Sequence, residues 1–147
     1  MKPNPTTLFI DNQETFDFVK PMLEKMLDQP DIIHCKSHKE AMDYVESDEY
    51  ADIIFADWEL TGYRFMDSVR HDLENHNTPV IIMSEDTNIQ HIVLNEIDRA
   101  GTYFLPKPFL QRGLVTTYDQ VLRGIERRRK FRIKPVCDIF LPVQFNE

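Results

Sequence analysis

Four side chains with complementary chemistry each follow the end of a short apolar run in this 147-residue chain: Asp11, Asp57, Ser84 and Lys107. A carboxylate can attack phosphorus and form an acyl phosphate. The transferred group carries several negative charges, so a divalent cation, an ammonium and a hydroxyl donor beside it stabilise it. The set therefore indicates phosphoryl transfer, in which Asp11 and Asp57 hold Mg²⁺ while Lys107 and Ser84 contact the phosphoryl oxygens.

The elements that must position these side chains alternate along the chain. Continuous apolar runs are typical of strands buried on both faces of a parallel sheet. The runs lie at residues 8–10, 53–56, 80–83 and 103–105, with a weaker one at 32–35. Between them, apolar residues recur with helical spacing. These stripes are Phe18, Val19, Met22, Leu23 and Met26; Ala41, Met42 and Val45; Phe65, Val69 and Leu73; Ile89, Ile92, Val93 and Ile97; and Leu114, Tyr118, Val121 and Ile125.

Strict alternation of strands and helices predicts an α/β fold, a doubly wound five-stranded parallel sheet with helices on both faces. Ligands of such sheets gather outside the carboxyl ends of the strands. The intervals of 46, 27 and 23 residues between the four polar side chains leave room for two, one and one crossovers. We therefore expect Asp11, Asp57, Ser84 and Lys107 to converge in one shallow pocket.

Composition and charge exclude several classes of function. The 25 acidic and 17 basic residues give a net charge of −8, which disfavours non-specific binding of nucleic acid. The 4 glycines are too widely spaced for a Walker loop or a dinucleotide-binding loop. The 2 cysteines form no disulfide framework and suit a reducing compartment. Without an apolar run near 18 residues or a signal segment, we expect a cytoplasmic protein that does not contact a membrane.

The charge is uneven along the chain. Residues 123–147 hold seven basic and three acidic residues, a net charge of +4, which leaves −12 for residues 1–122. We expect one domain over residues 6–127, followed by a basic C-terminal tail or linker at 128–147, or by the start of a truncated output domain. No helix-turn-helix fits after residue 129, so DNA is not an expected partner of this chain.

The sequence resembles the receiver domains of bacterial two-component response regulators. The matching segments are residues 8–12, 53–57, 79–84 and 100–109. The most specific of them is Lys107-Pro108-Phe109 after an aromatic strand. The resemblance implies the flavodoxin-like receiver fold with strand order 2-1-3-4-5. Its residue roles, carried over, are Asp57 as phosphoacceptor, Asp11 as metal-site acid, Ser84 as switch hydroxyl, Lys107 as phosphate-contacting lysine and Phe104 as switch aromatic.

The same resemblance implies a signalling module rather than an enzyme, with Mg²⁺ as its cofactor. A histidine kinase or phosphotransfer protein would donate the phosphoryl group to Asp57. Movement of Ser84 and Phe104 would then change the face made by the fourth helix, fifth strand and fifth helix, a two-state element biased by local charge. That face would contact a downstream protein or a missing output domain, or form a homodimer.

The sequence departs from the family pattern in three places: at Asn12, at Glu85, and in the loop at residues 58–62 after Asp57, which is short and lacks the usual Met-Pro. Asn12 stands where receivers carry a second acid, and its amide suits either a metal ligand or the cap of the first helix. Glu59 offers a further carboxylate to the metal. Glu85 follows Ser84, where receivers have a small residue, and would slow phosphoryl donors. Asn12 and Glu85 favour an alternative function, a degenerate receiver that binds proteins without being phosphorylated.

Two further alternatives remain open. Arg128 and Arg132 stand four residues apart before a strand-like segment, similar to the arginine pair with which PilZ domains grip the phosphates of cyclic di-GMP. The second PilZ motif is absent. A haloacid-dehalogenase-like phosphatase also forms an aspartyl phosphate, but that family needs Asp-x-Asp where this chain has Asp11-Asn12-Gln13.

Overall fold

The computed structural model describes residues 4–27, 29–93 and 101–126, which form a five-stranded sheet with helices packed on it. Every strand pair is parallel and the strand order is β2-β1-β3-β4-β5. The strands are β1 (Thr6–Ile10), β2 (Asp31–Cys35), β3 (Ile53–Asp57), β4 (Val80–Ser84) and β5 (Thr102–Pro106). The predicted fold class and strand order are confirmed.

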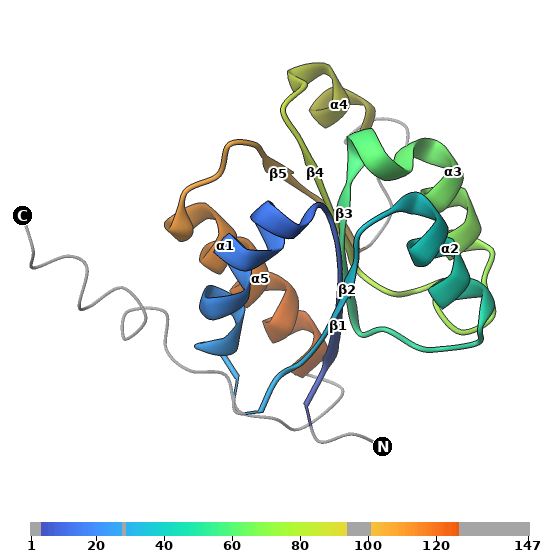
Figure 1. Ribbon diagram of the computed structural model, residues 1–147, viewed down its shortest axis with the longest axis horizontal. Helices are drawn as coiled ribbons and strands as arrows, with labels where there is room; N and C mark the ends of the chain where they lie inside the picture. The colour runs from blue at the N-terminus through green and yellow to red at the C-terminus, as the bar shows by residue number, and fades with distance from the viewer. Residues whose placement is uncertain (1–3, 28, 94–100, 127–147) are drawn as a thin grey trace, which may run out of the picture.

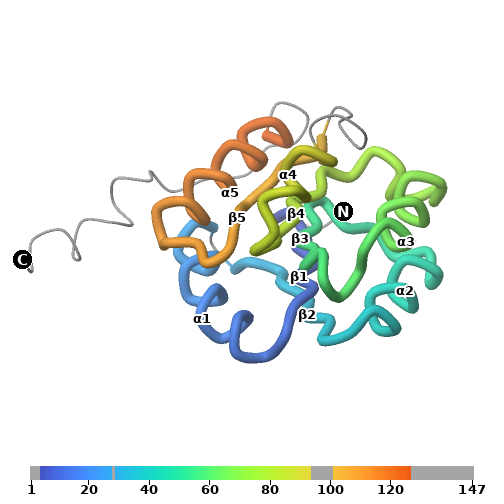
Figure 2. The backbone as a smooth tube through the Cα atoms, turned by 90° about the horizontal axis from the view of Figure 1, so that it is seen from above, coloured from blue at the N-terminus to red at the C-terminus, as the bar shows by residue number. Residues whose placement is uncertain are grey.

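Helices cover both faces of the sheet, as Figures 1 and 2 show, with α1 and α5 on one face and α2 and α3 on the other. The helices are α1 (Gln13–Glu24), α2 (His38–Glu46), α3 (Trp58–Arg70), α4 (Thr87–Ile92) and α5 (Gln111–Glu126). Among the described residues, no helix combines the length and the apolar character needed to cross a bilayer.

The continuous apolar runs are explained by two apolar cores, one on each face of the sheet. The first core joins the sheet to α1 and α5 and includes the fully buried Phe9, Phe55 and Tyr118. The second joins it to α2, α3 and α4 and includes Ile54 and Phe65. Each such buried side chain contributes about 1.5–3 kcal/mol, and β1, β3 and β4 are buried along their whole length, which explains why most of their residues on both faces are apolar.

Short polar side chains begin the first four helices. Each accepts a hydrogen bond from a backbone N–H in the first turn, which satisfies a donor that the helix itself leaves unpaired. These caps are Asn12 for α1, Ser37 for α2, Asp57 for α3 and Asp86 for α4.

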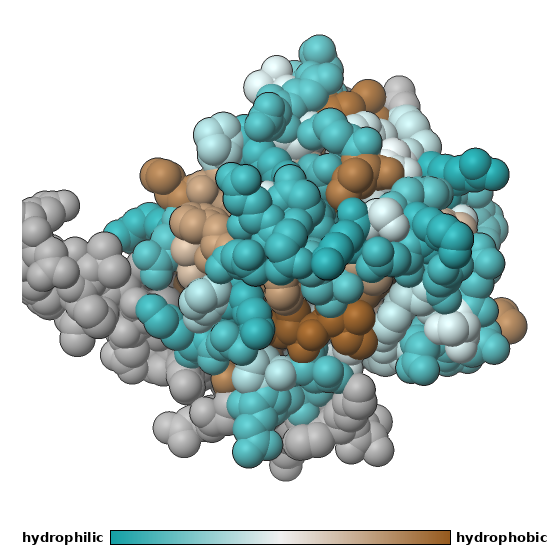
Figure 3. Space-filling view, viewed as in Figure 1, coloured by the Kyte–Doolittle hydropathy of each residue, from teal (hydrophilic) through white to brown (hydrophobic). Residues whose placement is uncertain are grey.

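Two residues of the predicted helical stripes do not lie in the core. Phe18 is 51% exposed because the buried face of α1 is formed by Val19, Met22 and Leu23, and Phe18 lies beside that face. Leu73 is 88% exposed because α3 ends at Arg70, so the helical spacing no longer applies to it. Hydrophilic side chains cover most of the surface seen in Figure 3, with small hydrophobic patches between them.

Several sequence predictions fall outside the described residues. They concern Ile97 in the fourth stripe, Arg128 and Arg132, and the tail at 128–147. The boundary at residue 127 and the arginine pair therefore stay predictions.

Candidate functional site

Strand register brings the predicted residues to one edge of the sheet. Ile10 pairs with Ala56, so the next residues, Asp11 and Asp57, leave neighbouring strands side by side. On the other side of β3, Asp57 pairs with Met83, one residue before Ser84. Ser84 in turn pairs with Pro106, and the backbone N–H of Lys107 donates to the Ser84 carbonyl at 2.8 Å. The sheet thus fixes where all four side chains begin.

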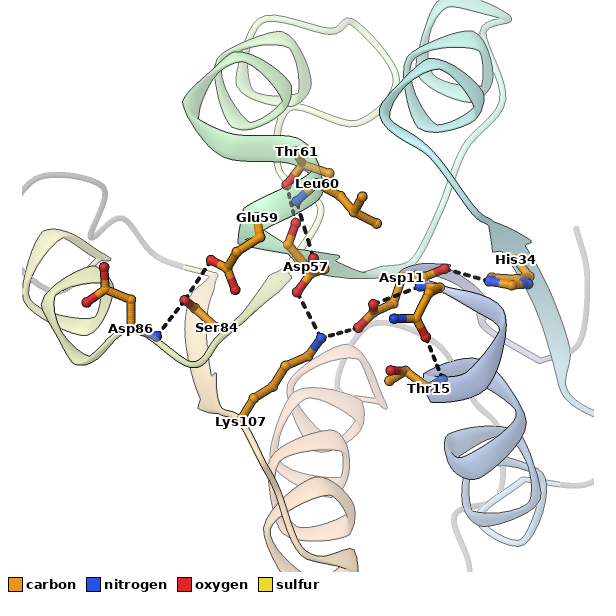
Figure 4. Close-up of polar contacts among 11 residues, drawn as sticks. Asp11, Thr15, His34, Asp57, Glu59, Leu60, Thr61, Ser84, Asp86 and Lys107 are labelled. Carbon is orange, nitrogen blue, oxygen red and sulfur yellow. Dashed lines mark hydrogen bonds and ion pairs between the residues drawn. The ribbon is translucent and has the colours of Figure 1, made fainter.

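Lys107 lies between two carboxylates at this edge (Figure 4). Its ammonium is 2.5 Å from Asp11 Oδ2 and 2.8 Å from Asp57 Oδ1. The side chains are 15%, 2% and 8% exposed for Lys107, Asp11 and Asp57, so water screens these charges poorly. Three ionisable groups, one directly after β1, one at the end of β3 and one after β5, therefore form one buried ion-paired centre.

Burial dominates the electrostatics of Asp57. Desolvation raises the pKa of this carboxyl above 3.8, and the charges of Asp11 and Glu59 raise it further, while the hydrogen bond and charge of Lys107 oppose the rise. For Lys107, burial lowers the pKa, but the hydrogen bonds and charges of Asp11 and Asp57 outweigh it and the pKa lies above 10.5. Two carboxylates that share one ammonium keep a net negative charge, and nearby positive charge favours their ionised form.

The other oxygen of Asp57 is held by the turn that follows β3. The backbone N–H of Leu60 donates to Asp57 Oδ2 at 3.2 Å, and the Thr61 hydroxyl donates to the Asp57 carbonyl at 2.9 Å. Gly62 then interrupts the helix with φ 58° and ψ −163°, a conformation that glycine adopts without steric cost. The first turn of α3 is therefore set apart from the rest of the helix.

Asp11 is held from three sides. The backbone N–H of Asn12 donates to Asp11 Oδ1 at 2.7 Å, and Lys107 binds Oδ2. The ring of His34, on β2, lies 2.8 Å from the Asp11 carbonyl through Nε2 and stacks on Phe16 with centroids 4.0 Å apart. The sequence did not predict the contact of His34 with Asp11, because that contact depends on the register in which β2 pairs with β1.

Ser84 makes contacts that the sequence did not predict. Its hydroxyl donates to Glu59 Oε2 at 2.9 Å and accepts from the backbone N–H of Asp86 at 3.0 Å (Figure 4). Ser84 is 1% exposed, whereas Glu59 is an exposed residue of the first turn of α3. The structure thus brings Ser84 to the same edge as Asp57 but directs its proton to Glu59.

The remaining predicted residues lie around this centre. Asn12 is exposed, and its side-chain oxygen accepts from the Thr15 N–H at 2.8 Å, so it caps α1. Phe104 is half-buried on β5 and packs against the second core. Glu85 is exposed and lines a cavity of about 530 Å³ beside Lys107. The lining is acidic and aromatic, formed by Asn12, Glu14, Thr15, Phe18, Glu85, Lys107, Pro108 and Phe109.

The donor set fits Mg²⁺ better than it fits zinc. Within the described ranges, no group of three or more His, Cys, Asp and Glu side chains is placed to hold a metal. Zinc needs three or four such ligands, whereas Mg²⁺ takes one or two carboxylates and completes its shell with water and phosphate oxygens. Asp11 and Asp57 supply those two carboxylates, with Lys107 as the cation between them.

Comparisons with known proteins find similarity in structure. The sequence matches no family model, and no curated protein matches it. The receiver domain of the Francisella response regulator 1452 is 26% identical, with a TM-score of 0.65 over 83% of this chain and 99% of that one. The chemotaxis response regulator CheY4 of Vibrio cholerae is 21% identical, with a TM-score of 0.67 over 80% of this chain and 98% of that one.

A third similar structure holds a metal ion. It is the receiver domain of the sensor histidine kinase PA1611 from Pseudomonas aeruginosa PAO1, with a magnesium ion coordinated in its active site cleft. It is 18% identical to this chain, with a TM-score of 0.60 over 84% of this chain and 96% of that one. All three matches span nearly the whole of the other chain, so the likeness concerns their complete fold.

Proposed function

We propose that this chain, which has the receiver-domain fold of two-component signalling, accepts a phosphoryl group on Asp57 in the presence of Mg²⁺. The donor is a histidine kinase or a phosphotransfer protein. The observation that carries the proposal is the buried cluster of Asp11, Asp57 and Lys107, in which one ammonium contacts both carboxylates. Such a cluster combines a nucleophile, a cation site and a fixed positive charge at the carboxyl ends of parallel strands.

The chemistry follows from what each side chain can do. A carboxylate oxygen of Asp57 attacks the phosphorus of a phosphohistidine; a P–O bond forms, the P–N bond breaks, and the leaving imidazole takes a proton from water. Lys107 is already 2.8 Å from Asp57 Oδ1, so its ammonium can follow the charge onto the phosphoryl oxygens. Ser84, one residue further along the edge, can donate its hydroxyl proton to a third oxygen.

Asp11 and Asp57 are the residues that would hold Mg²⁺. The ion, when bound, neutralises the negative charge that gathers on the phosphoryl oxygens. Asn12 and Glu59 are not needed as ligands in this scheme, because Asn12 caps α1 and Glu59 binds Ser84. Asp11 is well placed for the role, since His34 and the Asn12 N–H fix its backbone and its second oxygen.

The output of the module is a protein contact rather than a product. Phe104 lies on β5 and packs against the core that includes Ile89 of α4, so a shift of Ser84 and Phe104 would change the face made by α4, β5 and α5. A downstream protein, an output domain or a second copy of the chain would bind there. We place the protein in the cytoplasm, where phosphohistidine donors of this kind act.

Phosphorylation is tested by intact-mass analysis after incubation with Mg²⁺ and acetyl phosphate. Wild type should gain the mass of one phosphoryl group, and Asp57→Ala should not. Asp67→Ala is the matched control. Asp67 is an exposed carboxylate on α3, the helix that Asp57 caps, and 78% of its side chain is accessible. Equal gains in wild type and Asp57→Ala, or loss in Asp67→Ala as well, would contradict the assignment of Asp57.

The alternative is a module that binds its partner without phosphorylation. Its support is that Ser84 and Asn12, two side chains that could contact a phosphoryl group or a metal, are engaged by Glu59 and by the α1 backbone. Under this alternative, neither acetyl phosphate nor a kinase extract changes the mass, and beryllofluoride does not bind.

A further inference from the structure

The contact between Ser84 and Glu59 limits what Ser84 can do. A serine hydroxyl has one proton to donate and lone pairs to accept with. Here the proton goes to Glu59 Oε2 at 2.9 Å, and a lone pair accepts the Asp86 N–H at 3.0 Å. Ser84 is 1% exposed, so no water-filled space surrounds it into which the hydroxyl could turn freely. Its donor is therefore committed before any phosphoryl group arrives.

Glu59 is able to make and release this contact. It lies in the short first turn of α3, between the Asp57 cap and the break at Gly62, where φ is 58°. Its backbone is thus set apart from the longer helical segment that follows, while its side chain is exposed at the mouth of the site. Releasing Ser84 returns the Glu59 carboxylate to water and buries no charge.

The geometry points to Glu59 as a positioning residue that restrains Ser84, so that phosphorylation must replace the Glu59–Ser84 hydrogen bond with one from Ser84 to the phosphoryl group. This inference rests on the proposed phosphorylation of Asp57. Glu59 then competes with the phosphoryl group for the Ser84 hydroxyl. The protein stays in its resting state until the phosphoryl oxygens bind this hydroxyl more strongly than the Glu59 carboxylate does.

Glu59 also acts through its charge, and the two effects must be separated. Its carboxylate raises the pKa of Asp57, after burial, Lys107 and Asp11 have had their larger effects. Removing the charge would favour any anionic phosphoryl group whether or not Ser84 is restrained. A double-mutant cycle distinguishes them, because the charge effect persists when Ser84 is Ala and the restraint does not.

The first measurement tests the contact in the resting protein. Urea unfolding is compared for wild type, Glu59→Ala, Ser84→Ala and the double variant, in EDTA and without any phosphoryl donor. Because Glu59 is exposed, its hydrogen bond with Ser84 should be about as strong as an ordinary one, and the two substitutions should be coupled about fivefold in the unfolding equilibrium constant. Purely additive effects would overturn the inference, whatever the protein does with phosphate.

The second measurement tests whether the contact opposes switching. Trp58 is the single tryptophan of the chain, is half-buried beside Asp57 and packs edge-on against Tyr63 with centroids 5.0 Å apart. Its fluorescence should report binding of beryllofluoride with Mg²⁺. Glu59→Ala should tighten that binding about fivefold more when residue 84 is Ser than when it is Ala. Glu59→Gln, which keeps an acceptor without the charge, should keep part of the restraint.

Glu85→Gln is the matched control, because it removes an exposed charge next to Ser84 and should act equally in both backgrounds. If Glu59→Ala also acts equally in both backgrounds, the restraint is overturned while the proposed function stands. Absence of binding in every variant overturns both. Binding that begins only when Glu59 is replaced supports the restraint most strongly.

Discussion

The two ends of the sheet both bury polar side chains, but they satisfy them in different ways. At the amino end, Asp52, Asn75 and Thr78 are 4%, 0% and 2% exposed. At the carboxyl end, Asp11 and Asp57 are 1% and 6% exposed. Burial alone therefore does not separate the residues that hold the fold together from those that do chemistry.

At the amino end most of the partners are backbone groups, although Asn75 also contacts the side chains of Asp72 and Thr78. Asp52 Oδ2 accepts from the Thr6 N–H at 2.7 Å, and Asn75 Oδ1 accepts from the Ala51 N–H at 2.8 Å. Asn75 Nδ2 donates to the Glu49 carbonyl at 2.8 Å, and the Thr78 hydroxyl donates to the Ala51 carbonyl at 2.9 Å. Backbone partners are fixed by the chain path, so these contacts lock loops onto strand starts.

At the carboxyl end the key partners are other side chains. Lys107 binds Asp11 and Asp57, and Ser84 binds Glu59. Side chains can turn away and exchange partners without any change in the chain path. Buried charges with exchangeable partners are costly for the fold, and this is the end to which we assign the function.

The largest effect on stability is expected from the amino end. Asn75→Ala removes contacts to Ala51, Glu49 and Asp72 at a position with no exposure, and leaves buried backbone groups unpaired. The free energy of unfolding should fall by about 3 kcal/mol, measured by urea titration. Asn77→Ala, an exposed residue two positions on, is the control.

In the same Asn75→Ala protein, the folded fraction should still gain one phosphoryl group, because no contact of Asn75 reaches the opposite edge. Loss of phosphorylation in folded Asn75→Ala would show that the two ends are coupled, and would break the comparison.

The carboxyl end was largely predictable from sequence, because strand ends are marked by a change from apolar to polar residues. Asp11, Asp57 and Lys107 follow buried runs, and parallel pairing places them together. The amino end carried no such mark. Asn75 lies in a connection of no clear pattern, and its buried contacts arise only when that connection folds onto Ala51.

Side-chain contacts that depend on local backbone conformation could not be predicted from the sequence. The contact of Glu59 with Ser84 depends on the short turn that ends at Gly62, which no sequence pattern predicted, and the metal role of Glu59 stays a prediction. Asn12 suited two roles; its cap contact with the Thr15 N–H is present in the structure, and its role as a metal ligand stays a prediction. Phe18 shows the limit of a spacing argument, because an apolar residue one step from a buried face is half exposed.

A smaller effect, and one that a ligand reverses, is expected from Lys107→Met. The substitution leaves Asp11 and Asp57 without the cation between them, which should lower the free energy of unfolding by about 2 kcal/mol in EDTA, since the lysine is partly exposed. Mg²⁺ should restore part of this loss by binding the two carboxylates of the folded state. The measurement is urea unfolding with and without Mg²⁺.

Asn75→Ala provides the contrast for that experiment, because we propose no Mg²⁺ site at the amino end and expect Mg²⁺ to shift its stability no more than that of wild type. A Lys107→Met protein that is as stable as wild type in EDTA, or one that Mg²⁺ leaves unchanged, would contradict a cation site between Asp11 and Asp57.

The smallest effect concerns pH. Burial first, and then the charges of Asp11 and Glu59, raise the pKa of Asp57 above 3.8 in spite of Lys107, so the folded protein holds this proton to a higher pH than the unfolded chain does. The contribution of Asp57 to stability is therefore greatest below the unfolded pKa and is lost as pH rises through the folded pKa. Asp57→Asn has no such loss, so its stability relative to wild type should increase with pH across this window in EDTA.

Urea unfolding at a series of pH values measures that difference, and carbon NMR of the Asp57 carboxyl locates the window. Asp67→Asn, on the exposed side of α3, controls for the general effect of removing one negative charge from an acidic protein. If the stability of Asp57→Asn relative to wild type falls with rising pH, Lys107 lowers the pKa of Asp57 more than burial raises it. The carboxyl end would then be an ordinary stabilising ion pair rather than a site that favours a further cation.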